Sequence, residues 1–209
     1  MKGAMRAGDR KLHIINNAKK VFGRYGYHKT NIAMICGQSG IGRGTLYLYF
    51  KNKKAVFEAI IDDLVEQAAM VLNEEPVAIT NREEFYRTQI ERFERILTLI
   101  QQDRDFARMA FGVANEFPKI RQKIDRYFIA ILKKEIDLGK AMGIISEAVD
   151  TELAAVKLFG GTEKIIMHFF LSSKWLSKKK LRALIEQITR LDMFGFFHFD
   201  EVKPGELPI

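Results

Sequence analysis

The stretch that decides the fold lies between Thr30 and Lys54 and reads TNIAMICGQSGIGRGTLYLYFKNKK. Apolar residues in its first half recur at the spacing of one helical face, and Thr30 is placed to cap that helix. Gly40 breaks the pattern inside a short turn that begins at Ser39, and a second short helix is expected from Gly42 to Tyr49. Two short helices joined by a glycine-containing turn predict a helix-turn-helix.

Helical spacing continues on both sides of this stretch. A helix is expected from Asp9 to about Tyr25, with Leu12 on its apolar face, and it ends where Gly26 can take the left-handed conformation. Asn52 is placed to cap another helix, which continues to about Leu72. Beyond these, apolar residues again follow a helical period through long intervals without proline. Further helices are expected at residues 82–102, 104–115, 118–139, 150–172 and 178–198. The predicted fold class is therefore all-α, with a three-helix N-terminal head, a joining fourth helix and a larger helical body.

Positive charge is concentrated in the head. Residues 1–54 contain twelve Lys or Arg and one acid, Asp9, which gives a net charge of +11, whereas the remaining 155 residues carry 22 basic and 25 acidic side chains. Because a local positive field attracts a polyanion, nucleic acid is the leading partner, and a helix-turn-helix narrows this to double-stranded DNA. The alternative is a peripheral membrane protein whose basic first helix lies on anionic lipid. That alternative requires one continuous basic amphipathic helix, whereas the basic residues here are spread over three short helices.

Other functional classes have little support in the sequence. The single cysteine, Cys36, excludes an intramolecular disulfide and a cysteine-based zinc cluster, and the four histidines lack the spacing of metal ligands. The glycines from Gly40 to Gly44 resemble a dinucleotide loop only superficially, because no strand is expected before them. No apolar run of about 18 residues is present either. We therefore expect a cytoplasmic protein that is not an enzyme, does not bind membranes, and needs no metal or cofactor.

The second short helix carries the side chains suited to reading DNA. Arg43, Thr45 and Tyr47 are expected to project outward from it. Arginine reads guanine with two hydrogen bonds, threonine contacts thymine methyl groups or phosphates, and a tyrosine hydroxyl donates to phosphate oxygens. The alternative for Tyr47 is a core position, which is the better interpretation of Phe50 because of its place on the apolar face. For Arg43 and Lys53 the alternative is an ordinary solvated charge.

The segment from Ala18 to Phe57 closely resembles the TetR family of bacterial transcriptional regulators. The matching residues are VFGRYGYHKT before the first short helix, then Thr30, Ile35, Gly40, Gly44-Thr45-Leu46-Tyr47, Tyr49-Phe50 and Lys51-Asn52-Lys53. The resemblance implies that base edges face Arg43, Gly44 and Thr45, and that phosphates are held by Thr30, Tyr47, Tyr49 and Lys53. The sequence departs from the family at Gly42, where a serine-like cap is common, which predicts a looser second helix before DNA binds.

For the body, the resemblance implies a ligand cavity and a dimer interface. The expected domains are a DNA-binding head (1–54), a ligand-binding and dimerisation body (55–200) and a mobile tail (201–209). Residues 137–161, DLGKAMGIISEAVDTELAAVKLFGG, look like the corresponding region of regulators that sense fatty acids or acyl-coenzyme A thioesters. We expect a homodimeric regulator, in most of the family a repressor, that a small apolar effector releases from a palindromic operator.

The body is rich in large apolar side chains, which favours a pocket among its helices. Three glycines inside helical patterns, Gly112, Gly160 and Gly161, are expected to leave space for it. The candidate effector-pocket residues are Phe93, Leu97, Phe106, Met109, Phe128 and Phe159. For any one of them a simple core position is the alternative. The last two helices each show a broad apolar side, which predicts a four-helix interface between two copies.

Overall fold

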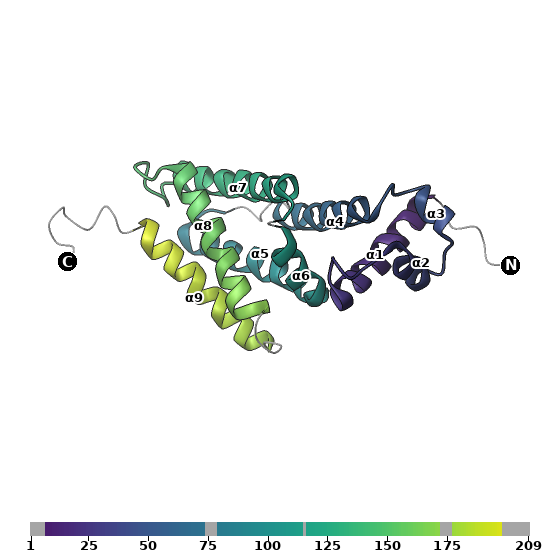
Figure 1. The fold of residues 1–209 in the computed structure, drawn as a ribbon. Helices are drawn as coiled ribbons and strands as arrows, with labels where there is room; N and C mark the ends of the chain where they lie inside the picture. The colour runs from purple at the N-terminus through teal and green to yellow at the C-terminus, as the bar shows by residue number, and fades with distance from the viewer. Residues whose placement is uncertain (1–6, 74–78, 115, 172–176, 198–209) are drawn as a thin grey trace. The chain divides into compact units, whose positions relative to one another are not determined.

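The computed structural model describes residues 7–73, 79–114, 116–171 and 177–197 (Figure 1). All regular structure in these ranges is helical, which confirms the all-α prediction. The first four helices are α1 (Ala7–Tyr25), α2 (Ile32–Ser39), α3 (Arg43–Tyr47) and α4 (Lys53–Asn73). They are followed by α5 (Arg82–Gln102), α6 (Arg104–Ala114), α7 (Pro118–Ala141), α8 (Thr151–Ile165), the π-helix η1 (Ile166–Leu171) and α9 (Lys178–Phe197).

Each of the expected helices is present, and three details differ. The second short helix is only five residues long, Arg43–Tyr47. The helix expected over 150–172 ends at Ile165 and continues as the π-helix η1. Leu12 was placed on the inner face of α1, but it is 47% exposed, so that assignment is wrong. The predicted mobile tail, residues 201–209, lies outside the described residues.

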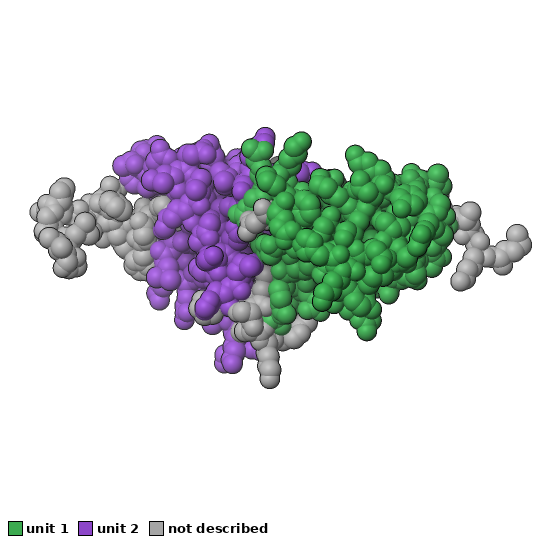
Figure 2. Space-filling view, in the orientation of Figure 1, with its two compact units in different colours: residues 1–69, 99–122 green, residues 70–98, 123–209 purple. Residues whose placement is uncertain are grey.

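The chain forms two compact units (Figure 2). Unit 1 comprises Met1–Ala69 and Leu99–Gln122, and unit 2 comprises Met70–Thr98 and Lys123–Ile209. The two units are defined by which residues pack together. The boundary predicted at residue 54 separates DNA binding from ligand binding, and it stays a prediction. Among the described residues, no helix is both long enough and apolar enough to span a bilayer.

The core of unit 1 is built on aromatic rings from four segments. The ring centroid of Phe57 in α4 lies 5.7 Å from that of Phe22 in α1 and 5.1 Å from that of Tyr27 in the following turn. It also lies 6.0 Å from Phe106 in α6 and 5.9 Å from Phe117, just before α7. Each such aromatic pair contributes about 0.5–1.5 kcal/mol beyond its area burial. Residues from α6 and its C-terminal turn therefore complete the core beneath the helix-turn-helix.

Two further contacts fasten α1 to α4 and α6 within unit 1. The buried ammonium of Lys19 lies 3.1 Å from Asp103 Oδ2, at the start of α6, and 3.8 Å from Asp63 Oδ2 in α4. One turn further along α1, Gly23 faces the backbone of α6: a Cβ placed there would lie 2.9 Å from the nitrogen of Phe106. The absence of a side chain at Gly23 is therefore what lets the two helices approach so closely.

Unit 2 has an apolar core and a buried charged pair. Its apolar cluster joins α7, α8 and the loop between them and consists of Ile136, Ile145, Ala154 and Ala155. The polar contact joins α5 to α7, because Arg92 Nη1 donates to Glu135 Oε1 and Gln89 Nε2 donates to Glu135 Oε2 over 2.9 Å. Removing one partner of a fully buried ion pair costs about 3–5 kcal/mol, and this largely buried pair holds α5 against α7 by at most that amount.

The close approach at Gly23 predicts opposite effects for two glycine-to-alanine changes in helices. Gly23→Ala would press a methyl group against the α6 backbone, and overpacking of this kind costs about 1–3 kcal/mol. Gly37→Ala in α2 meets no atom within 4 Å and gains up to about 1 kcal/mol of helix propensity. Urea denaturation should show a lower free energy of unfolding for the first variant and an equal or higher one for the second. Equal stability of the two variants would contradict the packing of α1 on α6.

Candidate nucleic-acid interface

Asparagine residues cap the N-termini of α2 and α4, the helices before and after α3. Asn31 has an extended backbone, and its side chain accepts a hydrogen bond from the Met34 N–H, 3.0 Å away. Asn52 does the same for α4, accepting from the Ala55 N–H over 2.9 Å, which confirms the predicted cap. The prediction that Thr30 caps α2 is wrong by one residue. Both residues have cap-forming side chains, and only the backbone conformation decides between them.

The turn between α2 and α3 has the conformation that its glycines permit. Gly40 ends α2 with a φ of 63°, in the left-handed region that favours glycine, and its N–H bonds back to α2. Gly42 is the N-cap of α3 and, having no side chain, gives that helix no capping hydrogen bond, as predicted. From α1, His13 Nε2 lies 3.0 Å from the Ser39 carbonyl oxygen. The turn is thereby tied to α1, a contact that sequence reasoning missed.

Alternation of buried and exposed residues sets the outward face of α3. Leu46 and Phe50 are buried, so they anchor the segment from below, and the core interpretation of Phe50 is confirmed. Arg43 and Gly44 are exposed, and Tyr47 is 53% exposed, which argues against a core position for this tyrosine. Thr45 and Tyr49 are half-buried, so each keeps part of its side chain at the surface. The structure thus brings four of the predicted contact residues together on α3: Arg43, Gly44, Thr45 and Tyr47.

Thr30 is placed differently from the residues on α3. It is only 2% exposed, and its hydroxyl donates a hydrogen bond of 2.7 Å to the carbonyl oxygen of Gly26. This bond closes the turn between α1 and α2, where Gly26 has a φ of 78°. In this conformation the hydroxyl of Thr30 serves the turn, while its backbone remains next to the Asn31 cap.

Lys53 holds the same turn from the start of α4. Its ammonium donates to the carbonyl oxygens of Tyr27 (2.8 Å), Thr30 (2.9 Å) and His28 (3.3 Å). It also lies 4.4 Å from the centroid of the Tyr27 ring, within the range of a cation–π contact. Burial lowers the pKa of the Lys53 ammonium from its ordinary value, because leaving water disfavours the charged form. Lys53 is therefore neither an ordinary solvated charge nor, in this conformation, a free phosphate ligand.

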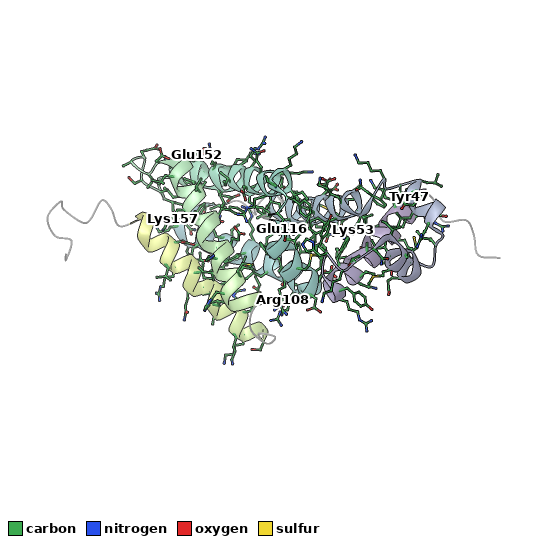
Figure 3. All side chains as sticks on the ribbon, in the orientation of Figure 1. Tyr47, Lys53, Arg108, Glu116, Glu152 and Lys157 are labelled. Carbon is green, nitrogen blue, oxygen red and sulfur yellow. The ribbon has the colours of Figure 1, made fainter. Side chains whose placement is uncertain are left out.

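Figure 3 labels Tyr47 and Lys53, which come from neighbouring elements but differ in what they contact. Tyr47 presents a largely exposed ring, whereas the three donors of Lys53 are directed at backbone carbonyls. An ammonium group has three N–H donors, so a phosphate contact by Lys53 requires the loss of one carbonyl bond. Sequence spacing gave no signal for this arrangement, since the accepting carbonyls lie 23 to 26 residues earlier in the chain.

The predicted pocket residues are divided between the two units. In unit 1, Phe106 is buried against Phe57 and Met109 is half-buried. In unit 2, Leu97 is buried, Phe93 is half-buried, and the rings of Phe128 and Phe159 stack 5.7 Å apart. The three glycines expected to leave space are exposed, and a Cβ at any of them would meet no atom within 4 Å, so open space does lie beside each of them. The pocket itself stays a prediction.

The chemistry available on the α3 face is that of anion and base recognition. It combines a guanidinium, hydroxyl groups and an exposed glycine backbone on a head whose net charge is +11. Within the described ranges, no group of three or more His, Cys, Asp or Glu side chains is placed to hold a metal ion. A helix of this kind, braced by a second helix across a tight turn, has the geometry that enters a major groove.

Known proteins resemble this chain over most of its length. Residues 14–60 match the family model of bacterial regulatory proteins of the tetR family. The fatty acid metabolism regulator protein of Bacillus subtilis is 25% identical over 188 residues, which are 88% of this chain and 94% of that protein. The solved structure of the fatty acid degradation regulator FadR from Bacillus halodurans has a TM-score of 0.73 at 19% identity, covering 90% of this chain and 97% of that one.

A second solved structure is FadR from Bacillus subtilis in complex with stearoyl-CoA. It has a TM-score of 0.67 at 23% identity and covers 88% of this chain and 98% of that one. At these identities the two structural comparisons establish a shared fold, in which a helix-turn-helix precedes further helices.

The clamp formed by Lys53 predicts an unusually large loss of stability for a lysine at the surface of a helix end. Lys53→Met removes three hydrogen bonds to carbonyl oxygens, and bonds made by charged groups contribute about 1.5–3 kcal/mol each. Because Lys53 is only partly buried, water can replace its ammonium at the freed carbonyl oxygens, so we expect urea denaturation to show a free energy of unfolding only about 1–3 kcal/mol lower than that of the wild type. The control, Lys51→Met, changes an exposed lysine two residues away and should stay within about 0.5 kcal/mol. Equal losses of stability in the two variants would show that the Lys53 hydrogen bonds do not stabilise the head.

Proposed function

Because this chain belongs to the TetR family of bacterial transcriptional regulators, we propose that it is a ligand-responsive regulator that represses transcription by binding an operator in double-stranded DNA. The observation that carries the proposal is the outward face of α3. It places an exposed guanidinium, a glycine and a tyrosine on the second helix of a helix-turn-helix, in the part of the chain that holds all of the net positive charge. We infer a cytoplasmic location from the same premise, because chromosomal DNA is there.

The proposed contacts follow the position of each side chain. Arg43 and Thr45 would reach base edges in the major groove, and Gly44 between them would allow the backbone to come close. Tyr47 and Tyr49 would donate from their hydroxyls to phosphates on one strand. For Thr30 and Lys53 the hydrogen bonds of the folded head support a positioning role, in which they hold the turn before α2. For Thr30 or Lys53 to contact a phosphate, its side chain would have to give up a hydrogen bond to a carbonyl oxygen when DNA binds.

Two copies of the chain would bind together. Leu153 on α8 is 70% exposed and Leu191 on α9 is 72% exposed, with Val156 also at the surface of α8. Exposed apolar residues on the last two helices support an interface made by four helices, two from each subunit. A twofold homodimer suits a palindromic operator, because each head would meet one half-site.

The proposed effector is a long-chain fatty acid or its coenzyme A thioester. Support comes from the relatives, since one is a fatty acid metabolism regulator and a solved structure of similar fold holds stearoyl-CoA. The large apolar side chains of the body, among them the stacked Phe128 and Phe159, suit an acyl chain. Release from DNA requires that the effector bind the non-binding state of the dimer more tightly, because a ligand with equal affinity for both states shifts nothing.

The DNA proposal predicts steep, residue-specific salt dependence. We expect wild-type protein to retard duplexes selected from a random library, with affinity falling sharply as salt rises, because phosphate binding releases counterions. Arg43→Ala should weaken binding to the selected duplex by about 10- to 100-fold through the loss of a bidentate base contact. The control, Arg126→Ala in α7, makes the same charge change on an exposed arginine outside the head and should bind as the wild type does.

Gel-shift titration at four salt concentrations measures both effects, with vesicles of phosphatidylglycerol as a competitor. Equal affinities of the wild-type and Arg43→Ala proteins would contradict a DNA contact by Arg43. Binding to the vesicles in preference to any duplex would favour the membrane-binding alternative instead.

The effector proposal predicts stabilisation that depends on acyl chain length. At about 100 times its Kd, a ligand that binds only the folded chain adds about 2.7 kcal/mol, which for a protein of this size raises the Tm by about 5–10 °C. We expect long-chain acyl-coenzyme A to give such a shift and to weaken operator binding, whereas coenzyme A without an acyl chain should do neither. If no chain length from 4 to 20 carbons shifts the Tm, the acyl effector is wrong while the DNA-binding proposal stands.

A further inference from the structure

Leu48 is the most exposed large hydrophobic residue among those that the structure describes. Its side chain is 83% exposed, compared with 53% for its neighbour Tyr47. It follows the last residue of α3 and lies between the two tyrosines of the proposed DNA-binding face, Tyr47 and Tyr49. A leucine so exposed, at the end of a short helix in a strongly basic head, gains nothing from the packing of the free protein.

The backbone around Leu48 is firmly held, so the exposure is not that of a loose loop. The Leu48 N–H donates to the Gly44 carbonyl oxygen over 3.3 Å, and the next two N–H groups, of Tyr49 and Phe50, both donate to the Leu46 carbonyl oxygen over 3.0 Å. Leu46 and Phe50 are buried on either side. Two buried anchors thus fix the backbone of the short segment from which Leu48 projects, so binding would have to order the leucine side chain but not the segment that carries it.

The major groove offers one apolar partner to such a side chain. Base edges there present hydrogen-bond donors and acceptors, and the only apolar group is the 5-methyl of thymine. Phosphates and the polar edges of guanine, cytosine and adenine cannot satisfy a leucine. The continuity of Leu48 with Arg43, Thr45 and Tyr47 on the same short segment places it at the edge of the surface that would face the groove.

We propose that Leu48 determines sequence specificity by packing against the 5-methyl group of a thymine in each half-site. The inference rests on the proposed function, because it assigns one contact within the proposed DNA-binding face. It commits the operator to an A·T pair beside the pairs read by Arg43 and Thr45. An apolar contact of Leu48 with a deoxyribose ring would give affinity without preference for thymine, and the test separates the two.

The experiment removes the methyl group from the DNA and the side chain from the protein, separately and together. Duplexes selected from a random library define the operator, and each thymine in one half-site is then replaced singly by uracil, which lacks only the 5-methyl group. Affinities are measured by fluorescence anisotropy for wild-type protein and for Leu48→Ala, with Leu138→Ala, an exposed leucine on α7, as the control. Circular dichroism checks that the three proteins have the same helix content.

The expected result is a coupling at one position. Uracil at one thymine should weaken wild-type binding about fourfold, the equivalent of one buried methyl group, and should have the same effect on Leu138→Ala. Leu48→Ala should bind the unmodified operator about as weakly as the wild type binds the uracil-substituted one. Uracil at that position should not weaken the binding of Leu48→Ala any further. The inference is overturned if wild-type affinity is insensitive to every uracil, or if Leu48→Ala loses as much affinity as the wild type at the same position.

A failure of the wild type to select any duplex would overturn the proposed function and this inference with it. Normal selection and binding with no thymine effect would overturn the role of Leu48 alone. The two failures are therefore distinguishable in one series of measurements.

Discussion

The Phe57 ring is the contact on which unit 1 depends. It stands in the first turns of α4 and touches rings from α1, from the turn after α1, from α6 and from the residue before α7. Because these rings come from segments far apart in the chain, one buried side chain fixes where α1, α4 and α6 meet. The Lys53 clamp, the Lys19 ion pairs and the close approach at Gly23 are arranged around the same junction. The outward face of α3 is presented by a head that these contacts hold together.

The sequence was sufficient to predict the parts of the fold that depend on local chemistry. Apolar spacing located the helices, and the breaks at Gly26 and Gly40 were predicted because left-handed backbone there favours glycine. Asn52 was recognised as a cap because its side chain bonds only three residues ahead. The exposed position of Arg43 and the buried position of Phe50 followed from the same periodicity. Each of these features depends on residues that lie within one or two helical turns of one another in the chain.

Contacts between distant segments were beyond the reach of the sequence. The role of Lys53 depends on carbonyl oxygens more than twenty residues away, and a carbonyl has no sequence identity to recognise. The grouping of residues 99–122 with the head accompanies contacts between segments far apart in the chain, such as those of Phe57 and Gly23 with Phe106. The choice of Asn31 over Thr30 as the cap depends on the local backbone, which is extended at Asn31, and on the Thr30 hydroxyl being bonded to the Gly26 carbonyl oxygen instead. The pocket stays a prediction, because helical spacing does not show whether the open space beside the exposed glycines Gly112, Gly160 and Gly161 belongs to a cavity.

Under the proposed function, the α3 faces of two subunits read a symmetric site in double-stranded DNA. Hydroxyl-radical and methylation footprinting of the selected operator tests this most directly. We expect two equivalent patches of major-groove protection, related by twofold symmetry and centred about one helical turn, ~34–36 Å, or a multiple of it apart. Uniform coverage without preferred positions, or protection confined to the minor groove, would contradict it.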